Sequence, residues 1–284
     1  MTERVIMGIH GLLNKPARQT LEAWWADALL EGLKRNGAAD LAPAFELAYW
    51  ADVRHASPIA LAELDEPYLE ASGAGPLPRY EPGLLDKARE VADKWGSRKI
   101  DKAKDLIGVG PVVEELLGVK LADLGEYYAD DRIRQGIRRR LGALLDRHRD
   151  DSILLIAHSM GSIIAHDVLR ELESASPVAV EHWITIGSPL GLPLVSKKIR
   201  DEFGEQRTPT NVRRWSNLAD PGDKVALDCN LETDYGPGLE GVQVEDVLVE
   251  NGYVNALGEA NNHKSYGYLR VPELSDRVDS FLSL

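Results

Sequence analysis

Cysteine is almost absent from this sequence of 284 residues, in which Cys229 is the only one. A single thiol cannot form an intrachain disulfide, so an oxidising compartment is not indicated. A lone cysteine of this kind is typically a small apolar side chain rather than a reactive group. The chain is long enough to bury a sizeable core without disulfides, as one large domain or two small ones.

Positive charge is also scarce, because 33 lysines and arginines face 46 acidic residues, a formal net charge of −13. An acidic chain repels phosphate backbones at long range, so we expect no nucleic-acid partner. Apolar runs are short, and none approaches the roughly 18 residues that a membrane helix requires. The N-terminal residues lack the pattern of a secretory signal. We therefore expect a cytoplasmic globular protein without a transmembrane segment, and the oligomeric state stays open.

Segments with strand character alternate with segments of helical period along the chain. The strand candidates are 5–10, 44–49, 152–157, 180–187, 212–218 and 242–249. The helix candidates are 17–35, 131–147, 162–172 and 272–282, and the alternation includes a further helix between the strands 180–187 and 212–218. An unbroken apolar run such as 152–157 is typical of a strand buried on both faces of a parallel sheet. The order predicts a single α/β domain over 1–284, with a mostly parallel central sheet and helices on both faces.

The segment 53–128 interrupts this alternation. A Pro- and Gly-rich bend at 72–83 is followed by two stretches of helical character, the second of which begins at Pro111. In the first stretch, four apolar residues share one face: Leu84, Ala88, Val91 and Trp95. We interpret 53–128 as a mostly helical insertion within the domain, either a stabilising excursion or a lid over a site.

The helix predicted at 131–147 has one apolar stripe and one basic face. The basic face carries five arginines: Arg132, Arg134, Arg138, Arg139 and Arg140. A basic helix face is usually solvated, and binding of an anion or a membrane surface is the less favoured alternative. We therefore expect these arginines in solvent.

The strongest functional signal is the segment 156–161, Ile-Ala-His-Ser-Met-Gly, where an apolar strand runs into a helix. A tight turn there forces the hydroxyl of Ser159 out of the sheet and places it at a helix N-terminus, whose dipole favours developing negative charge. The usual pattern is Gly-x-Ser-x-Gly, and Ala157 replaces its first glycine with another small residue. An ordinary strand-to-helix turn is the structural alternative. We predict Ser159 as a nucleophile.

A serine hydroxyl is a weak nucleophile and needs a base within hydrogen-bond reach. After Ser159 the chain offers only His166, His182 and His263. His166 lies within the helix that follows the turn, and His182 lies near the start of a strand. His263 lies in the polar segment 261–267, just before the final helix, which is where a base carried by a loop belongs. We predict His263 as the general base.

The acid that orients this base is expected in the loop after the strand at 212–218, since the chain order in this fold class is serine, acid, histidine. This loop contains two aspartates in a turn built by Pro221 and Gly222. We favour Asp223 as the acid and keep Asp220 as the alternative. The other aspartate then serves to cap the turn.

Acyl transfer also requires two N–H donors for the oxyanion. The amide of Met160 directly follows the nucleophile, and Gly11 lets the backbone turn after the first strand, so we choose the amide of Leu12 as the second donor. His10 is expected to pack beside this loop, and His158 to be a structural neighbour of the nucleophile rather than its base. Three residues are assigned to the substrate-binding surface: Gly11, His158 and Ser188.

Taken together, the motifs are His10-Gly11, the segment 157–161, Gly187-Ser188-Pro189-Leu190, Asp223-x-Val225 and His263-x-Ser265-x-Gly267-Tyr268-Leu269. This set resembles the α/β-hydrolase superfamily, and within it the lipase-like and GPI-inositol-deacylase-like serine esterases. The resemblance covers almost the whole chain, and only 53–128 lacks a counterpart. It implies acyl-ester hydrolysis through an acyl-enzyme, with Ser159, Asp223 and His263 at the triad positions.

The sequence therefore predicts a serine carboxyl-ester hydrolase that acts on a small-molecule or lipid-like ester. A lipase, phospholipase, thioesterase or acyltransferase with the same triad is the nearer alternative, and a non-catalytic binding protein of the hydrolase fold is the more distant one. We expect no cofactor and no metal, because the sequence has no cluster of His, Cys and carboxylates at metal-ligand spacing.

Overall fold

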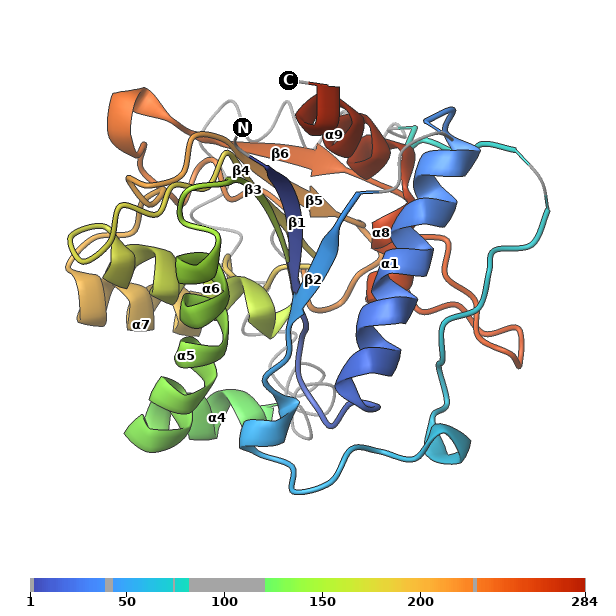
Figure 1. The fold of residues 1–284 in the computed structure, drawn as a ribbon, viewed down its shortest axis with the longest axis horizontal. Coiled ribbons are helices and arrows are strands. Elements are labelled where there is room, and N and C mark those ends of the chain that lie inside the picture. Colours follow the sequence, from blue (N-terminus) through green and yellow to red (C-terminus); the bar gives the residue numbers. More distant parts are fainter. Residues whose placement is uncertain (1–2, 39–42, 74, 82–120, 227–228, 284) are drawn as a thin grey trace.

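A six-stranded parallel sheet forms the centre of the protein (Figure 1). The computed structural model describes residues 3–38, 43–73, 75–81, 121–226 and 229–283. Its strands are β1 (Arg4–Ile9), β2 (Phe45–Ala48), β3 (Ser152–His158), β4 (His182–Ile186), β5 (Trp215–Ala219) and β6 (Val244–Leu248). They lie in the order β2-β1-β3-β4-β5-β6, and every neighbouring pair is parallel. The predicted α/β class with a parallel sheet is confirmed.

Helices cover both faces of the sheet (Figure 1). One face packs against α1 (Arg18–Arg35), α8 (Ser265–Arg270) and α9 (Pro272–Ser283). The other packs against α4 (Leu121–Ala129), α5 (Asp131–Arg147), α6 (Met160–Leu172) and α7 (Pro193–Phe203). The buried apolar side chains accordingly form two clusters, one on each side of the sheet.

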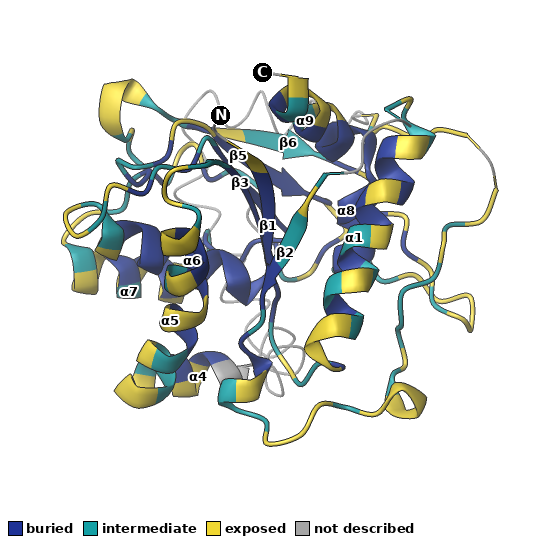
Figure 2. Ribbon diagram, viewed as in Figure 1, coloured by how far each residue is buried: buried dark blue, intermediate teal, exposed yellow. Residues whose placement is uncertain are grey.

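The strand β3 shows why its sequence is apolar without alternation. Ile153 and Leu155 belong to the cluster under α4 to α7, whereas Leu154 and Ile156 belong to the cluster under α1, and all four are 0% exposed. Successive side chains of a strand point to opposite faces, and here both faces are covered. Figure 2 shows β1 and β3 as buried, with the exposed turns of the helices facing outward.

Strands and long helices lie within a few residues of their predicted bounds, and α7 occupies the place that the alternation gave to a helix between the strands 180–187 and 212–218. The helix α8 was missed. It begins at Ser265, inside the segment 261–267 that was predicted as a loop. The prediction was wrong there because α8 has only six residues and contains Gly267, a poor helix former.

The segment 53–128 is described only at its two ends. Residues 54–73 and 75–81 contain a single 3₁₀ turn, η2 (Leu61–Glu63), which follows η1 (Ala51–Val53), and the helices predicted for this segment come after that stretch. The helix α4 occupies the end of the segment. The helices predicted at 84–95 and after Pro111 lie outside the described residues, and a lid stays a prediction.

One arginine of the predicted basic face is buried rather than solvated. The side chain of Arg138 is 2% exposed and pairs with Asp167 Oδ2 at 2.6 Å. It also donates to Tyr127 Oη at 2.8 Å and to Glu202 Oε1 at 2.8 Å. This guanidinium therefore joins α5 to α4, α6 and α7, because a buried charge must be paired within the protein.

Because the strands are parallel, the loops that follow them gather at one edge of the sheet. The loops after β1, β3, β5 and β6, together with the first residue of α6, contain all of the predicted catalytic and oxyanion-binding residues. This edge is the place where the sequence motifs meet.

Candidate active site

Ser159 stands at the tip of the turn between β3 and α6. Its backbone has φ 54° and ψ −129°, a conformation that is costly for a side chain other than glycine. A Cβ at position 161 would lie 2.6 Å from the carbonyl oxygen of Ile9, so Gly161 permits the close approach of α6 to β1. Strain of this kind, held by tight packing, presents the hydroxyl above the sheet edge.

Three side chains from three loops form a continuous hydrogen-bonded chain. The hydroxyl oxygen of Ser159 lies 2.9 Å from His263 Nε2, and His263 Nδ1 lies 2.8 Å from Asp223 Oδ2. The side chain of Asp223 is 0% exposed, whereas that of His263 is 18% exposed. A buried carboxylate thus holds the imidazole on one side, and the imidazole faces the hydroxyl on the other.

Asp220 lies in the same turn as Asp223 but has other partners. Its Oδ1 accepts from the amide of Gly222 at 2.7 Å and from Asn262 Nδ2 at 3.0 Å, and its Oδ2 accepts from the amide of Asn251 at 2.7 Å. None of these bonds involves His263. Asp220 therefore fastens the loops after β5 and β6 to the segment before α8, in the manner of a turn cap.

Tyr268 on α8 is a residue of this site that the sequence reasoning did not single out. Its hydroxyl accepts from the amide of Asp220 at 3.0 Å and donates to Asp223 Oδ2 at 2.8 Å. Burial and then the charge of Asp223 raise the pKa of Tyr268 well above its ordinary value, so the hydroxyl keeps its proton. The same carboxylate oxygen therefore receives one donor from Tyr268 and one from His263. The only sequence signal was its place within the segment 263–269.

The backbone of Gly11 lies directly against the nucleophile. A Cβ at position 11 would be 2.7 Å from Ser159 Cβ and 3.2 Å from its hydroxyl oxygen, so no larger residue fits there. Met160 is the first residue of α6, and its amide has no partner within the helix. In the part of the chain that the structure describes, the Leu12 amide likewise has no hydrogen-bond acceptor. The assignment of both amides as oxyanion donors stays a prediction.

His10 holds the loop that carries Gly11 and Leu12. Its Nε2 accepts from the amide of Trp50 at 3.0 Å, so the ring proton is on Nδ1, which donates to the carbonyl oxygen of Gly11 at 2.9 Å. Burial and then the charge of Lys15 lower the pKa of His10 to about 3, so the ring stays neutral. The expectation that His10 packs beside this loop is confirmed.

The other two residues assigned to substrate binding are buried. His158 is 9% exposed, and its Nε2 donates to the carbonyl oxygen of His263 at 2.8 Å. Burial and then the neighbouring His263 lower the pKa of His158 well below its ordinary value. Ser188 is 2% exposed, and its hydroxyl accepts from the amide of Leu190 at 3.3 Å. Their role in substrate binding stays a prediction.

The two histidines that were rejected as the base lie elsewhere in the fold. His166 is 0% exposed within α6, where its ring meets Trp183, Phe203 and Tyr235. His182 begins β4 and its Nε2 lies 2.9 Å from the hydroxyl of Ser216. It therefore belongs to the opposite end of the sheet from Ser159.

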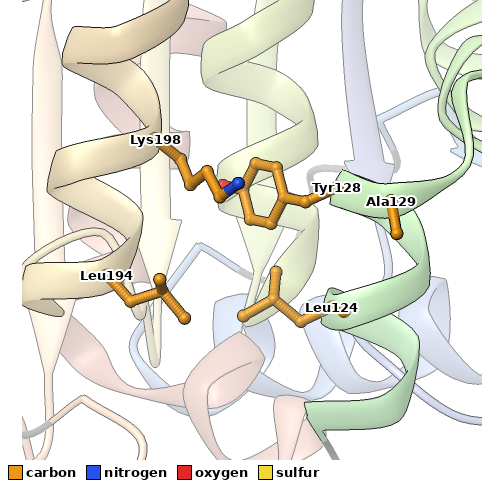
Figure 3. Close-up of a pocket in the computed structure, with 6 residues that line it drawn as sticks. Leu124, Tyr128, Ala129, Leu194 and Lys198 are labelled. Carbon is orange, nitrogen blue, oxygen red and sulfur yellow. The ribbon is translucent and has the colours of Figure 1, made fainter.

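A shallow pocket of about 370 Å³ opens between α4 and α7 (Figure 3). Six residues line it: Leu124, Gly125, Tyr128, Ala129, Leu194 and Lys198. Leu124 and Leu194 point toward one another, and Lys198 Nζ lies 5.3 Å from the centre of the Tyr128 ring. None of the predicted catalytic residues lines this pocket, and we assign it no role in the site.

Among the described residues, no three or more histidines, cysteines and carboxylates are placed to hold a metal ion. In the same part of the chain, no helix has the length and apolar character needed to cross a membrane.

Comparison with known proteins gives one weak similarity. No protein-family model and no curated protein matches this chain. Among solved structures, a "Putative hydrolase from Agrobacterium vitis S4" is 17% identical, with a TM-score of 0.29, over 51% of this chain and 65% of that one. The chain thus spans less than two thirds of that protein. A TM-score this low does not establish a shared fold, and the fold described above rests on the strand order and the helix layers.

Proposed function

We propose that this protein is a serine hydrolase that cleaves carboxylic esters through an acyl-enzyme. The observation that carries the proposal is the hydrogen-bonded chain from Ser159 Oγ to His263 Nε2, at 2.9 Å, and from His263 Nδ1 to Asp223 Oδ2, at 2.8 Å. A serine that only closed a turn would need neither an imidazole nor a buried carboxylate behind it. The strained backbone of Ser159 supports the same interpretation.

In the first half of the reaction, Ser159 Oγ bonds to the ester carbonyl carbon while its proton moves to His263 Nε2. The carbonyl electron pair moves to oxygen, where the amides of Met160 and Leu12 donate to it. The tetrahedral intermediate collapses, the bond to the alcohol breaks, and the alcohol oxygen takes the proton from Nε2. Asp223 stabilises the imidazolium and holds its Nδ1 proton throughout.

In the second half, His263 removes a proton from water, and the hydroxide attacks the acyl carbon. Collapse releases the carboxylic acid and returns the proton to Ser159. The substrate that we propose is a small-molecule or lipid-like ester. Neither step requires a metal or an organic cofactor, since the two donors and the imidazole supply the charge stabilisation and the proton transfer.

A fluorophosphonate probe tests this proposal, because it reacts with an activated serine. Wild type should be labelled at Ser159, and Ser159→Ala should not be labelled. Ser162→Ala is the matched control: it also loses one hydroxyl, but that hydroxyl donates to the carbonyl oxygen of Ala157 at 3.0 Å and is buried. Unlabelled wild type would refute the assignment and favour a binding protein. Equal labelling of wild type and Ser159→Ala would also refute it, because the reactive group would then be another residue.

The acyl and leaving groups can be separated with a panel of substrates. We expect turnover of p-nitrophenyl esters, and the dependence on acyl length distinguishes an esterase from a lipase. A phospholipid or an acyl-CoA substrate cleaved in preference to every simple ester would instead identify a phospholipase or a thioesterase on the same triad.

A further inference from the structure

The segment after η2 crosses the molecule as a strap, which we define as residues 66–71. Two bonds attach the strap to Glu31 on α1: the Tyr68 hydroxyl donates at 3.1 Å and the Ala71 amide at 2.9 Å. A third comes from Arg270 on α8, whose Nη1 donates to the carbonyl oxygen of Leu69 at 2.9 Å. Glu31 is 7% exposed, so this anchorage is buried. The strap is therefore part of the packed structure.

The first residue of the strap contacts the segment that carries His263. Both carboxylate oxygens of Glu66 lie 2.8 Å from Asn261 Nδ2, and one lies 3.3 Å from Lys264 Nζ. Beside this contact, the hydroxyl of Tyr253 donates to the carbonyl oxygen of Pro67 at 2.7 Å. The strap thus binds residues 261–264 through Glu66.

Asn261 transmits this contact to the imidazole-bearing residue. Its Nδ2 faces Glu66, so its Oδ1 points the other way and accepts from the backbone amide of His263 at 3.0 Å. A side-chain amide can make both bonds in only one of its two orientations. The carboxylate of Glu66 accepts hydrogen bonds and cannot donate them, and it therefore selects the orientation that holds His263.

We propose that Glu66 is a positioning residue for His263, acting through the side-chain amide of Asn261. The inference rests on the proposed function, because it assumes that His263 serves Ser159 as a base. The imidazole is held at Nδ1 by Asp223, and the backbone of His263 is held at its carbonyl oxygen by His158 Nε2 and at its amide by Asn261. The amide contact is the one that depends on the strap.

Two substitutions of Glu66 separate the role of its acceptor oxygens from the role of its charge. Glu66→Ala removes both acceptors, so the amide of Asn261 is free to turn over. Glu66→Gln keeps one oxygen that can accept from Asn261 Nδ2, replaces the other oxygen by an NH2 donor, and loses the charge that faces Lys264. We expect the rate of fluorophosphonate labelling at Ser159 to fall about tenfold in Glu66→Ala, below the roughly hundredfold that a displacement of 1 Å can cost. Glu66→Gln should recover part of that rate, because its remaining oxygen can still accept from Asn261 Nδ2.

Glu70→Gln is the matched control, because Glu70 is an exposed carboxylate on the same strap. It should label at the wild-type rate. Tyr68→Phe removes one bond between the strap and α1 without touching Asn261, and it measures the effect of loosening the strap itself. If Tyr68→Phe slows labelling as much as Glu66→Ala does, the specific contact to Asn261 is not what positions His263, and the proposal is wrong.

Hydrogen exchange at the His263 amide provides a second readout that needs no activity. Glu66→Ala should speed this exchange at least tenfold relative to Glu70→Gln, because the amide loses its acceptor, and Glu66→Gln should give a rate between those of Glu66→Ala and wild type. If the probe does not label wild type, only the proposed function is refuted. The exchange rate would still show whether Glu66 holds the backbone amide of His263. Unchanged exchange in Glu66→Ala would overturn the inference, whatever the labelling shows.

Discussion

Asp220 and Asp223 show how two identical residues in one turn acquire different tasks. Asp223 accepts from His263 and Tyr268, whereas Asp220 accepts only from groups that close and join loops. Replacing either carboxylate by an amide puts a donor where an acceptor is needed. The consequence differs because Asp223 Oδ2 faces the imidazole of His263, whereas the oxygens of Asp220 face backbone amides.

We therefore expect Asp223→Asn to lose ester hydrolysis by about 10³-fold or more, since the amide cannot hold the imidazole in the required tautomer. Asp220→Asn should lower the free energy of unfolding by about 1–3 kcal/mol, the cost of leaving buried donors without an acceptor. Its folded fraction should keep hydrolysis within about tenfold of wild type. Steady-state kinetics and urea unfolding of both variants check this. Loss of activity in Asp220→Asn alone would show that the acid was assigned to the wrong residue.

At the scale of the element, α8 links the residues of the site to the loop after β6. It follows His263, contains Tyr268, and approaches the loop after β6 through Gly267. A Cβ at position 267 would lie 1.8 Å from Asn251 Oδ1 and 2.5 Å from the backbone oxygen of the same residue. The backbone cannot give way as a flexible side chain can, so any side chain at this position displaces the helix or the loop.

Gly267→Ala should therefore destabilise the protein by about 3 kcal/mol. Gly142→Ala on α5 is the control, because its Cβ would meet only Val168 Cγ1, at 4.0 Å. That substitution should stabilise the protein by about 0.5–1 kcal/mol through the better helix propensity of alanine. Denaturant unfolding of the two variants at one pH measures both effects. Equal changes in the two would mean that α8 is not packed as the structure shows.

At the scale of the whole molecule, buried neutral histidines set the response to acid. Burial is the main cause that lowers the pKa of His10 and His182 to about 3 and that of His158 well below its ordinary value. The unfolded chain binds protons on these rings near pH 6.5, which the folded protein does not. Their stabilisation is complete above pH 6.5 and is lost as the pH falls below it. His148 acts in the opposite direction, because hydrogen bonds to Asp151 and Glu46 outweigh its burial and raise its pKa.

From pH 7.5 to 5.5, the three buried rings should together lower the free energy of unfolding by up to about 4 kcal/mol, less the contribution of His148. His182→Gln removes one of these rings far from Ser159, and the loss between the two pH values should shrink by about 1.4 kcal/mol. Denaturant unfolding of wild type and His182→Gln at both pH values gives this difference directly. A wild-type stability that does not change over this range would contradict the burial of neutral rings.

Local patterns were enough to predict the order of the elements and the places where the chemistry lies. The apolar run of β3, the turn at Ser159 and the polar segment before α9 each involve only a few consecutive residues. Strands and helices repeat every two to four residues, so short patterns of this kind are enough to predict them. The sequence alone therefore located the strands, the tight turn and the histidine that follows β6. It missed α8, because a six-residue helix with a glycine leaves too short a pattern.

Only the tertiary structure decided which groups become partners. His263 meets Asp223 across 40 residues of chain, Asn261 meets Glu66 across 195, and Arg138 is drawn inward by Asp167. A single sequence does not reveal such pairs, because a buried polar group accepts any partner that satisfies its hydrogen bonds, and the fold selects which one is within reach. Residue types and local periods set what each segment can do, whereas the packing of distant loops at one sheet edge sets what they do together.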